Sequence, residues 1–454
     1  MNILQITALK IIQKLIYILE DDEDFKKERL VIKKLENLTQ EELEKIFKND
    51  NIWLFDQSPI KQNNSLNGST LYNISKHRVE KKLLTDSYMT KTPNGKSIEE
   101  YQKLHWCVPN NTTRLAVGCW VGSGHITLFN NNSDILDNLL VADEKASIHA
   151  AYFTLDSTAI LATDMSKANL FYVEIEDQQK FGKKYSFDIY KWTKDKPKCD
   201  NWPSVIKPIT FFPIHNKRGG VTLSCGGYLI VNFENPEKMF VEKYYTPLQM
   251  PNAGLLSYYD TNKKRLFTNN GVGTGSTASG LHNALYFFDD ININTDKKSK
   301  WPRHPNTSYR VNTGDSHGMQ NVGNYLYVVD RANNSLNTVN LNNPLETKSF
   351  SFVPKRKLGL DLICKGEMSK NGEANLYVSL RGRTPLSGNN KELNNAVGTK
   401  AGLAVFKTTD YGKNVELKYI LTIDNKIAIN KNDHSEKIEK DIADAHGIMC
   451  IITK

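Results

Sequence analysis

The feature that most constrains the fold is a four-strand unit that recurs along the chain and is clearest after residue 315. Two short runs, 325–329 and 336–341, are rich in Tyr, Val and Leu, and an Asn-Asn-Ser turn separates them. A strand beginning at His317 precedes the pair, and a further apolar run follows it. Such runs, bounded by turn residues, are typical of antiparallel β-strands. Their repetition at a steady spacing predicts a β-propeller.

The end of the chain repeats the beginning of this unit. The motif Asp-x-His-Gly occurs at 315–318 and again at 444–447, where a single strand-like run follows it. Residues 52–55, in contrast, open a unit that lacks its first strand. We expect the C-terminal strand to pair with residues 52–55, because closing the ring removes exposed strand edges. Counting this shared blade once predicts an all-β fold, a seven-bladed β-propeller closed by the C-terminal strand.

Residues 1–50 have a helical pattern, so we expect an α-helical N-terminal extension (1–50) followed by the propeller (51–454). Thr39 and Glu42 have the spacing of a capping box at a helix start. Helices this short need a partner surface. They are expected to pack against the propeller or to bind a protein partner, and both alternatives stay open. The three helix candidates cover residues 12–19, 26–35 and 41–47.

Composition narrows the classes of partner. The net charge of the 454 residues is +9, but the basic clusters fit solvated loops and no nucleic-acid motif accompanies them, so no nucleic-acid partner is expected. The longest apolar runs fall short of the roughly 18 residues that a membrane span requires. We therefore expect no membrane span.

The cysteines indicate a compartment. Six cysteines are scattered through strand-like runs without a Cys-x-x-Cys pair, which favours buried free thiols over a zinc ribbon or a redox motif. The apolar N-terminal run contains Lys10 and Lys14 and lacks a small-residue cleavage site, so a secretory signal is not favoured. These features predict a cytoplasmic protein.

Residues 325–341, with their Tyr-Val-Val and Asn-Asn-Ser segments, resemble the repeat of the YVTN family of seven-bladed propellers. Residues 115–129 and 149–175 look similar. The family includes lactonase-like enzymes and cytochrome d1-like domains, so the resemblance implies the architecture of most of residues 51–454. The repeat specifies a blade, and propellers carry unrelated activities, so the resemblance carries no catalytic residue with it.

Four histidines fall at corresponding positions when the blades are aligned by their first strands. First strands of propeller blades line the central channel. Imidazole suits iron, copper and zinc, so the pattern predicts one transition-metal ion (Fe, Cu or Zn) in the channel. Asp315 and Asp444 each precede a histidine by two residues and share its strand face. This spacing predicts that each carboxylate hydrogen-bonds to the histidine ligand without binding the metal itself. The four predicted ligands are His105, His149, His317 and His446.

Two other interpretations of the histidines stay open: a metal-free polar pocket, and histidines that only hydrogen-bond to neighbouring loops. Arg331 and Arg381 each follow a second strand and are expected to face the adjacent blade or the channel rim. The predicted function is a small-molecule site in the axial channel, with a His-ligated metalloenzyme as one form of it. The alternatives are a non-catalytic protein-interaction scaffold and a metal-free lactonase-like hydrolase, so whether the chain is an enzyme stays open.

Overall fold

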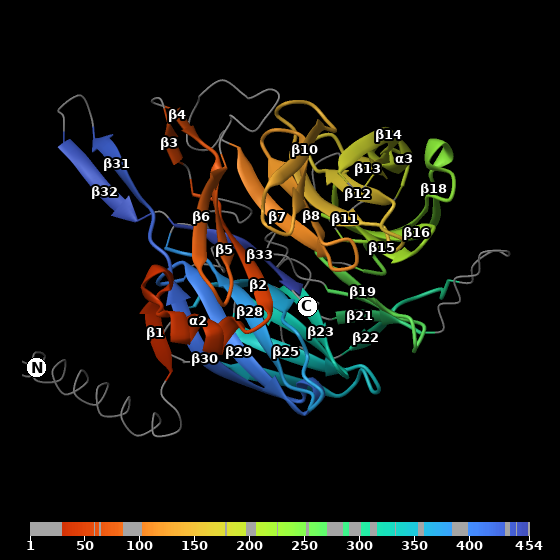
Figure 1. Ribbon diagram of the computed structural model, residues 1–454. Helices are drawn as coiled ribbons and strands as arrows, with labels where there is room; N and C mark the ends of the chain where they lie inside the picture. The colour runs from red at the N-terminus through yellow and green to blue at the C-terminus, as the bar shows by residue number, and fades with distance from the viewer. Residues whose placement is uncertain are drawn as a thin grey trace, which may run out of the picture.

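The structure is a seven-bladed β-propeller. Seven sheets built on four antiparallel strands can be counted within the described part of the chain, and they are arranged around a central axis (Figure 1). The computed structural model describes residues 30–58, 60–62, 65–84, 102–177, 179–196, 206–224, 226–250, 254–269, 285–289, 301–308, 316–331, 333–352, 358–383, 398–431, 436–441 and 443–452.

Each blade is numbered by its place in the ring, and its strands are given from the inner strand outward. Blade one contains β33 (Ala445–Ile452), β2 (Asp50–Asp56), β5 (Ser69–Ile74) and β6 (Val79–Leu84). Blade two contains β7 (Lys103–Asn110), β8 (Leu115–Val121), β9 (His125–Asn130) and β10 (Ile135–Leu140). Blade three contains β11 (Ile148–Phe153), β12 (Ala159–Asp164), β13 (Asn169–Glu176) and β14 (Lys180–Asp188).

The remaining blades follow the same order. Blade four contains β15 (Pro208–His215), β16 (Arg218–Leu223), β17 (Tyr228–Asn232) and β18 (Phe240–Tyr245). Blade five contains β19 (Ser257–Asp260), β20 (Arg265–Thr268), β21 (Leu285–Phe288) and β22 (Asn306–Ser308). Blade six contains β23 (Ser316–Val322), β24 (Tyr325–Asp330), β25 (Ser335–Asn340) and β26 (Thr347–Ser351). Blade seven contains β27 (Leu360–Lys365), β28 (Ala374–Leu380), β29 (Gly402–Thr409) and β30 (Asn414–Thr422).

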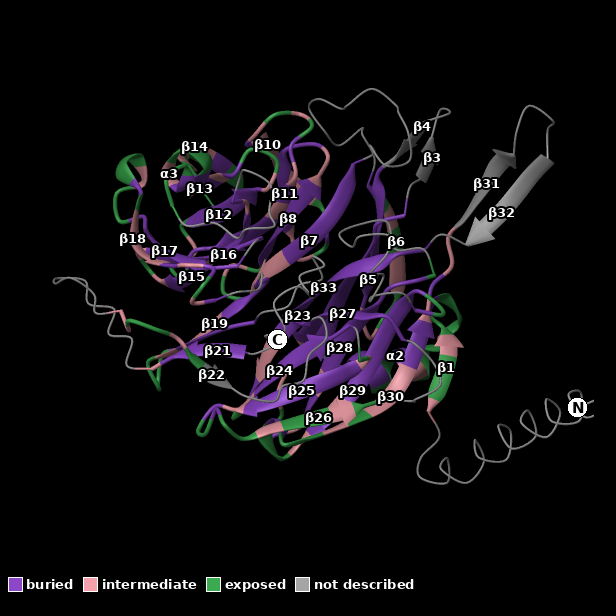
Figure 2. Ribbon diagram, turned by 180° about the vertical axis from the view of Figure 1, so that it is seen from behind, coloured by how far each residue is buried: buried purple, intermediate pink, exposed green. Residues whose placement is uncertain are grey.

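Burial falls from the inner strands to the outer ones, as Figure 2 shows. Strand β2 lies between two other strands of its sheet and is buried at every residue. The outermost strands β14 and β26 consist mostly of exposed and partly buried residues. Apolar runs therefore form the inner strands, because both of their faces pack against neighbouring blades, whereas partly exposed runs form the edges.

The ring closes as the sequence predicts. Strand β33 pairs antiparallel with β2, and Leu54 lies opposite Ile448 in this ladder. The other edge of β2 pairs with β5, so strands from both ends of the propeller belong to one sheet.

The N-terminal extension is helical in part. The helix α2 (Gln40–Phe47) is confirmed together with its capping box, and Phe47 stacks on Tyr377 with ring centroids 5.9 Å apart. The prediction of a helix over 26–35 is wrong at residues 31–34, which form the strand β1 (Val31–Lys34). This strand pairs parallel with β30 and is followed by the 3-10 helix η1 (Leu35–Asn37). Adjacent Val and Ile favour an extended chain, and an open sheet edge supplies their backbone partners. The candidate at 12–19 lies outside the described residues, and the division at residue 50 stays a prediction.

Two segments of polar or charged composition contain hairpins. The polar segment 57–69 contains β3 (Ile60–Gln62) and β4 (Ser65–Asn67), and the charged segment 424–440 contains most of β31 (Lys426–Lys431) and β32 (Glu436–Asp441). Among the described helices, none has the length and apolar content needed to cross a membrane. The remaining helical segments are α3 (Ile189–Thr193), η3 (Pro236–Lys238) and η5 (Asp410–Gly412).

Candidate functional site

The inner strands share an irregularity near their starts. Six of them shift their pairing register at the second or third residue, so that the ladder with the next strand skips a position. A β-bulge of this kind bends the strand and re-aims the side chain of the skipped residue. The positions skipped include His105 in β7, His149 in β11, Ile209 in β15, His317 in β23, Asp361 in β27 and His446 in β33.

The bulges bring the four predicted histidines together. The ring centroid of His105 lies 4.5 Å from that of His149 and 4.4 Å from that of His446. His317 joins from the other side, with its centroid 5.6 Å from that of His446. Three of the rings are almost fully buried and His149 is half-buried. The role of the cluster in binding a metal stays a prediction.

Asp361 belongs to this cluster, although the sequence analysis did not select it. One carboxylate oxygen, Oδ1, lies 2.7 Å from His317 Nδ1, and the other, Oδ2, accepts a hydrogen bond from His446 Nδ1. The side chain is fully buried. Asp361 is the second residue of its inner strand, the same place that His317 and His446 occupy in theirs. An acidic residue at the histidine position of an inner strand was the available signal.

Two arginines surround this carboxylate. Arg331 Nη1 lies 3.4 Å from Asp361 Oδ1, and Arg381 Nε lies 3.6 Å from Oδ2. Arg381 also forms a bidentate pair with Asp444, with its Nη2 2.6 Å from Oδ2. The Asp444 carboxylate thus faces Arg381, and its predicted role in supporting the histidines stays a prediction. Asp315 lies outside the described residues.

Burial sets the protonation of the cluster. Burial lowers the pKa of His149 to about 3, helped by the rings of His446 and His317. Burial and then Arg331 lower the pKa of His317 to about 3, although Asp361 opposes this shift. Burial also holds the pKa of His105 well below its usual value. These three imidazoles are neutral at neutral pH, so each has one N–H and one lone pair.

The hydrogen-bond partners assign the tautomers of three rings. His149 Nδ1 donates to the carbonyl oxygen of Ile209 at 3.1 Å, and His446 Nδ1 donates to Asp361. The Gln57 amide donates to His105 Nδ1 at 2.9 Å, so the proton of His105 is on Nε2. That nitrogen lies 3.4 Å from Nε2 of His446. A hydrogen-bonded chain thus runs from Gln57 through two histidines to Asp361.

For Asp361 itself, burial raises the pKa of the carboxyl group. The neighbouring His317, His446 and Arg381 outweigh burial and hold the pKa well below its usual value. Asp361 is therefore ionised and acts as an acceptor toward both histidines.

The glycine that follows two of the histidines has a packing role. A Cβ atom at Gly318 would lie 2.8 Å from the carbonyl oxygen of Asp361, and one at Gly447 would lie 2.9 Å from the carbonyl oxygen of His105. Both obstacles are backbone atoms of the neighbouring inner strand, which have little room to move. The His-Gly pair thus combines a channel-facing side chain with close contact between adjacent blades.

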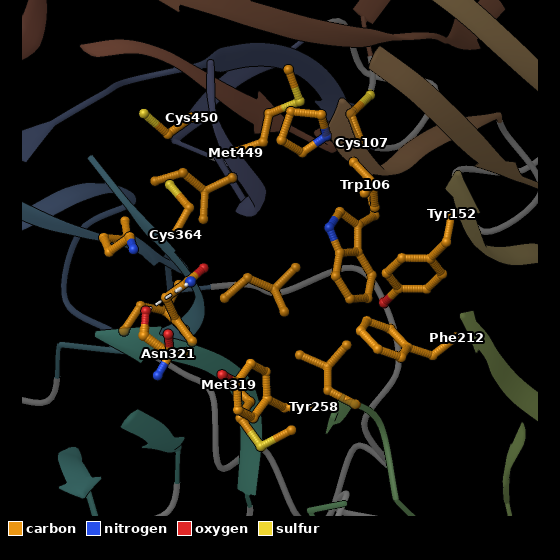
Figure 3. Close-up of a pocket in the computed structure, with 18 of the residues that line it drawn as sticks. Trp106, Cys107, Tyr152, Phe212, Tyr258, Met319, Asn321, Cys364, Met449 and Cys450 are labelled. Carbon is orange, nitrogen blue, oxygen red and sulfur yellow. Dashed lines mark hydrogen bonds between the residues drawn. The ribbon is translucent and has the colours of Figure 1, made fainter. Parts of the chain in front are cut away.

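A cavity of about 440 Å³ lies beyond the cluster, toward the carboxyl ends of the same inner strands (Figure 3). Its wall is mainly apolar and includes Trp106, Tyr152, Phe212, Tyr258 and Met319. Cavities of a few hundred Å³ with apolar walls are the usual form of small-molecule sites. The cavity also contacts free, buried cysteines, in agreement with the prediction of free thiols: Cys107, Cys364 and Cys450.

Within the described residues, no three His, Cys, Asp or Glu side chains are arranged as a preformed metal site. The four rings are adjacent, but they pack on one another and hydrogen-bond. Any metal would have to take the place of the contact between His105 and His446.

No protein-family model and no curated protein sequence matches the chain. Among solved structures, a putative 6-phosphogluconolactonase from Bacteroides fragilis is similar, with a TM-score of 0.52, 10% identity, and coverage of 89% of this chain and 98% of that one. One from Bacteroides uniformis has a TM-score of 0.50 and 10% identity, covering 89% and 100%. Virginiamycin B lyase from Staphylococcus aureus has a TM-score of 0.44 and 10% identity, covering 70% and 84%. At this identity, the two lactonase-like structures support the fold alone.

Proposed function

We propose that the axial channel is a small-molecule site whose reactive end is a transition-metal centre held by His105, His149, His317 and His446. The observation that carries the proposal is the way the rings are fixed through Nδ1. His149 and His446 use Nδ1 on a carbonyl and a carboxylate oxygen, and His317 Nδ1 lies beside the same carboxylate. Metal-binding histidines are oriented in this way, since an acceptor on one nitrogen directs the other toward the ion.

The spacing and the charge state of the rings support this proposal. Two nitrogens bound to one tetrahedral ion at about 2.0–2.1 Å lie about 3.3–3.4 Å apart. The Nε2 atoms of His105 and His446 are separated by 3.4 Å. Neutral imidazoles are the form that binds a metal, and burial keeps His105, His149 and His317 neutral. Iron, copper and zinc all accept such ligands, and the bound ion would supply Lewis-acid or one-electron chemistry.

This chain would have to adjust at one residue. His105 holds its proton on Nε2, the nitrogen that faces His446. To offer that nitrogen as a ligand, His105 must move the proton to Nδ1. Rotation of the Gln57 amide would then present its oxygen as the acceptor. Gln57 therefore acts as a positioning residue in this proposal.

The metal-free hydrolase is the weaker alternative. A general base works best when its pKa lies near the operating pH. With pKa values of about 3, His149 and His317 are weak bases at neutral pH. Metal binding uses the same lone pairs without needing a proton from substrate.

The test is metal content. The chain, purified without a histidine tag and stripped with a chelator, is equilibrated separately with Fe(II), Cu(II) or Zn(II) and analysed by mass spectrometry. We expect one equivalent of one metal. His317→Gln and His446→Gln should each lower the affinity at least tenfold, and Asp361→Asn should lower it by about 10–100-fold.

His77→Gln is the matched control, because His77 is exposed on the turn after β5. It should bind metal as the unchanged chain does. If folded protein takes up no stoichiometric metal with any of the three ions, the metal centre is excluded. The same result follows if His77→Gln weakens binding as much as His317→Gln does.

A further inference from the structure

The cavity beside the histidine cluster has an aromatic wall. Tyr152 contacts Trp106 on one side and Phe212 on the other, both edge to face, with ring centroids 5.6 and 5.1 Å apart. Figure 3 shows the three rings together on one side of the cavity. Edge-to-face packing holds aromatic rings in fixed orientations, so this wall is preformed. A flat apolar molecule can pack against it.

The rest of the lining mixes flexible, aliphatic and polar side chains. In Figure 3, Met319 and Tyr258 lie across the cavity from Trp106, and Asn321 lies on the side away from the aromatic wall. Leu362 and Ile448 also line the cavity. Methionine adapts its shape and packs well against aromatic rings. The two sides together fit a planar ring system that lies between a rigid wall and an adaptable one.

One polar group in this wall has no partner. The Tyr152 hydroxyl is buried, and the described residues offer it no hydrogen bond. Burial raises the pKa of Tyr152 well above its usual value, so the group is a neutral O–H donor. Leaving a buried donor unpaired costs free energy, and a ligand with an acceptor atom at this place would recover it.

We infer that this cavity binds a planar, uncharged aromatic molecule with one hydrogen-bond acceptor, such as a carbonyl oxygen, which accepts from the Tyr152 hydroxyl. The inference deepens the small-molecule site proposed above by naming its ligand class. It rests on the channel as the binding place, but it does not require the metal. The ligand is uncharged because the wall around Tyr152 is apolar. Lys365, the charged residue in the lining, belongs to blade seven, whereas Tyr152 belongs to blade three.

The experiment compares two probes that differ at one group. 2-Acetylnaphthalene and 2-ethylnaphthalene have the same ring system, but only the first has a carbonyl oxygen. Affinities are measured by isothermal titration calorimetry with chelator-treated full-length protein. We expect 2-acetylnaphthalene to bind about fivefold more tightly, the ratio that one neutral hydrogen bond of about 1 kcal/mol gives.

Tyr152→Phe should abolish this fivefold preference and leave the affinity for 2-ethylnaphthalene unchanged. Tyr190→Phe is the matched control, because Tyr190 is exposed, and it should keep the preference. Leu362→Trp, which fills the cavity, should weaken both probes. Cooperative urea unfolding of each variant establishes that it is folded.

Three results would overturn the inference: no binding of either probe, a preference that survives in Tyr152→Phe, or tighter binding of 2-naphthoate that Lys365→Met removes. The last result would assign the cavity to an anion. The probes are titrated into chelator-treated protein, so the probe test does not depend on metal occupancy. If the protein binds the probes but takes up no metal, only the metal centre is rejected. If it takes up metal but does not bind the probes, only the aromatic ligand is rejected.

Discussion

Arg381 and Asp444 form a bidentate ion pair, with Arg381 Nε 2.7 Å from Oδ1 and Nη2 2.6 Å from Oδ2 of the carboxylate. Arg381 follows β28 in blade seven, and Asp444 directly precedes β33 in blade one. Both side chains are almost completely buried. The pair therefore joins the seventh blade to the strand that closes the ring.

We expect Asp444→Ala to lower the free energy of unfolding by about 3–5 kcal/mol, because it removes the bidentate partner of the buried Arg381 guanidinium and leaves only Asp361, at 3.6 Å. Urea denaturation followed by circular dichroism measures this change. Glu234→Ala is the control, since the Glu234–Lys217 pair is exposed. It should change the free energy of unfolding by less than about 1 kcal/mol. Equal effects of the two substitutions would contradict the importance given to the buried pair.

Gly447→Ala should destabilise the propeller by about 1–3 kcal/mol, the usual cost of forcing an extra methyl group into a packed interior. The new Cβ would meet the backbone of the neighbouring inner strand at His105. At Gly182 the nearest atoms belong to the side chain of Glu176, which is exposed and can move. Gly182→Ala should therefore have little effect. If both variants lower the melting temperature by the same amount, the close contact between inner strands is not what makes Gly447→Ala destabilising.

Deletion of residues 444–454 should prevent cooperative folding of the whole ring, because β2 loses its inner partner and an open edge remains. Gel filtration and thermal unfolding measure the outcome. Replacement of residues 425–442 by a short Gly-Ser linker is the matched control, since β31 and β32 pair only with each other among the described strands. A truncated chain that unfolds at the same temperature as the full chain would rule out closure by β33 as the source of stability.

Asp50 should make the free energy of unfolding fall as the pH rises, whereas an ion-paired surface carboxylate makes it rise. Burial raises the pKa of Asp50 above 3.8, even though its carboxylate accepts hydrogen bonds from Tyr377 and Glu367. The folded state therefore keeps the proton at pH values where the unfolded chain has lost it. The stability that this residue contributes is complete below pH 3.8 and is lost as the pH rises through the folded-state pKa.

Urea denaturation across this pH range should show the free energy of unfolding falling, relative to Asp50→Asn, as the pH rises. Asp134→Asn provides the contrast, because Lys82 lowers the pKa of Asp134 and its contribution is lost as the pH falls. A rising difference for Asp50 would mean that its hydrogen bonds outweigh burial.

The blades and the closure of the ring were predictable because their signals are local. Short apolar runs between turn residues mark each strand, and the incomplete units at 52–55 and 444–452 complement each other. The position of the histidines followed from the same alignment. Asp361 was missed because its importance depends on a partner 85 residues away, and within its own strand it is a single acid. Strand β1 was missed for a similar reason, since its partner β30 is distant in the sequence.

The hydrogen bond between the Asp444 backbone and Asp56 joins residues 388 positions apart. During synthesis at about 5–20 residues per second, β2 therefore waits roughly 20–80 s before its inner neighbour exists. Throughout that interval the inner edge of β2 is unpaired and can bind another extended segment. One such segment is β2 of a second nascent chain. The step most exposed to misassembly is therefore the interval before β33 is made, and a chaperone that shields β2 on the ribosome would act there.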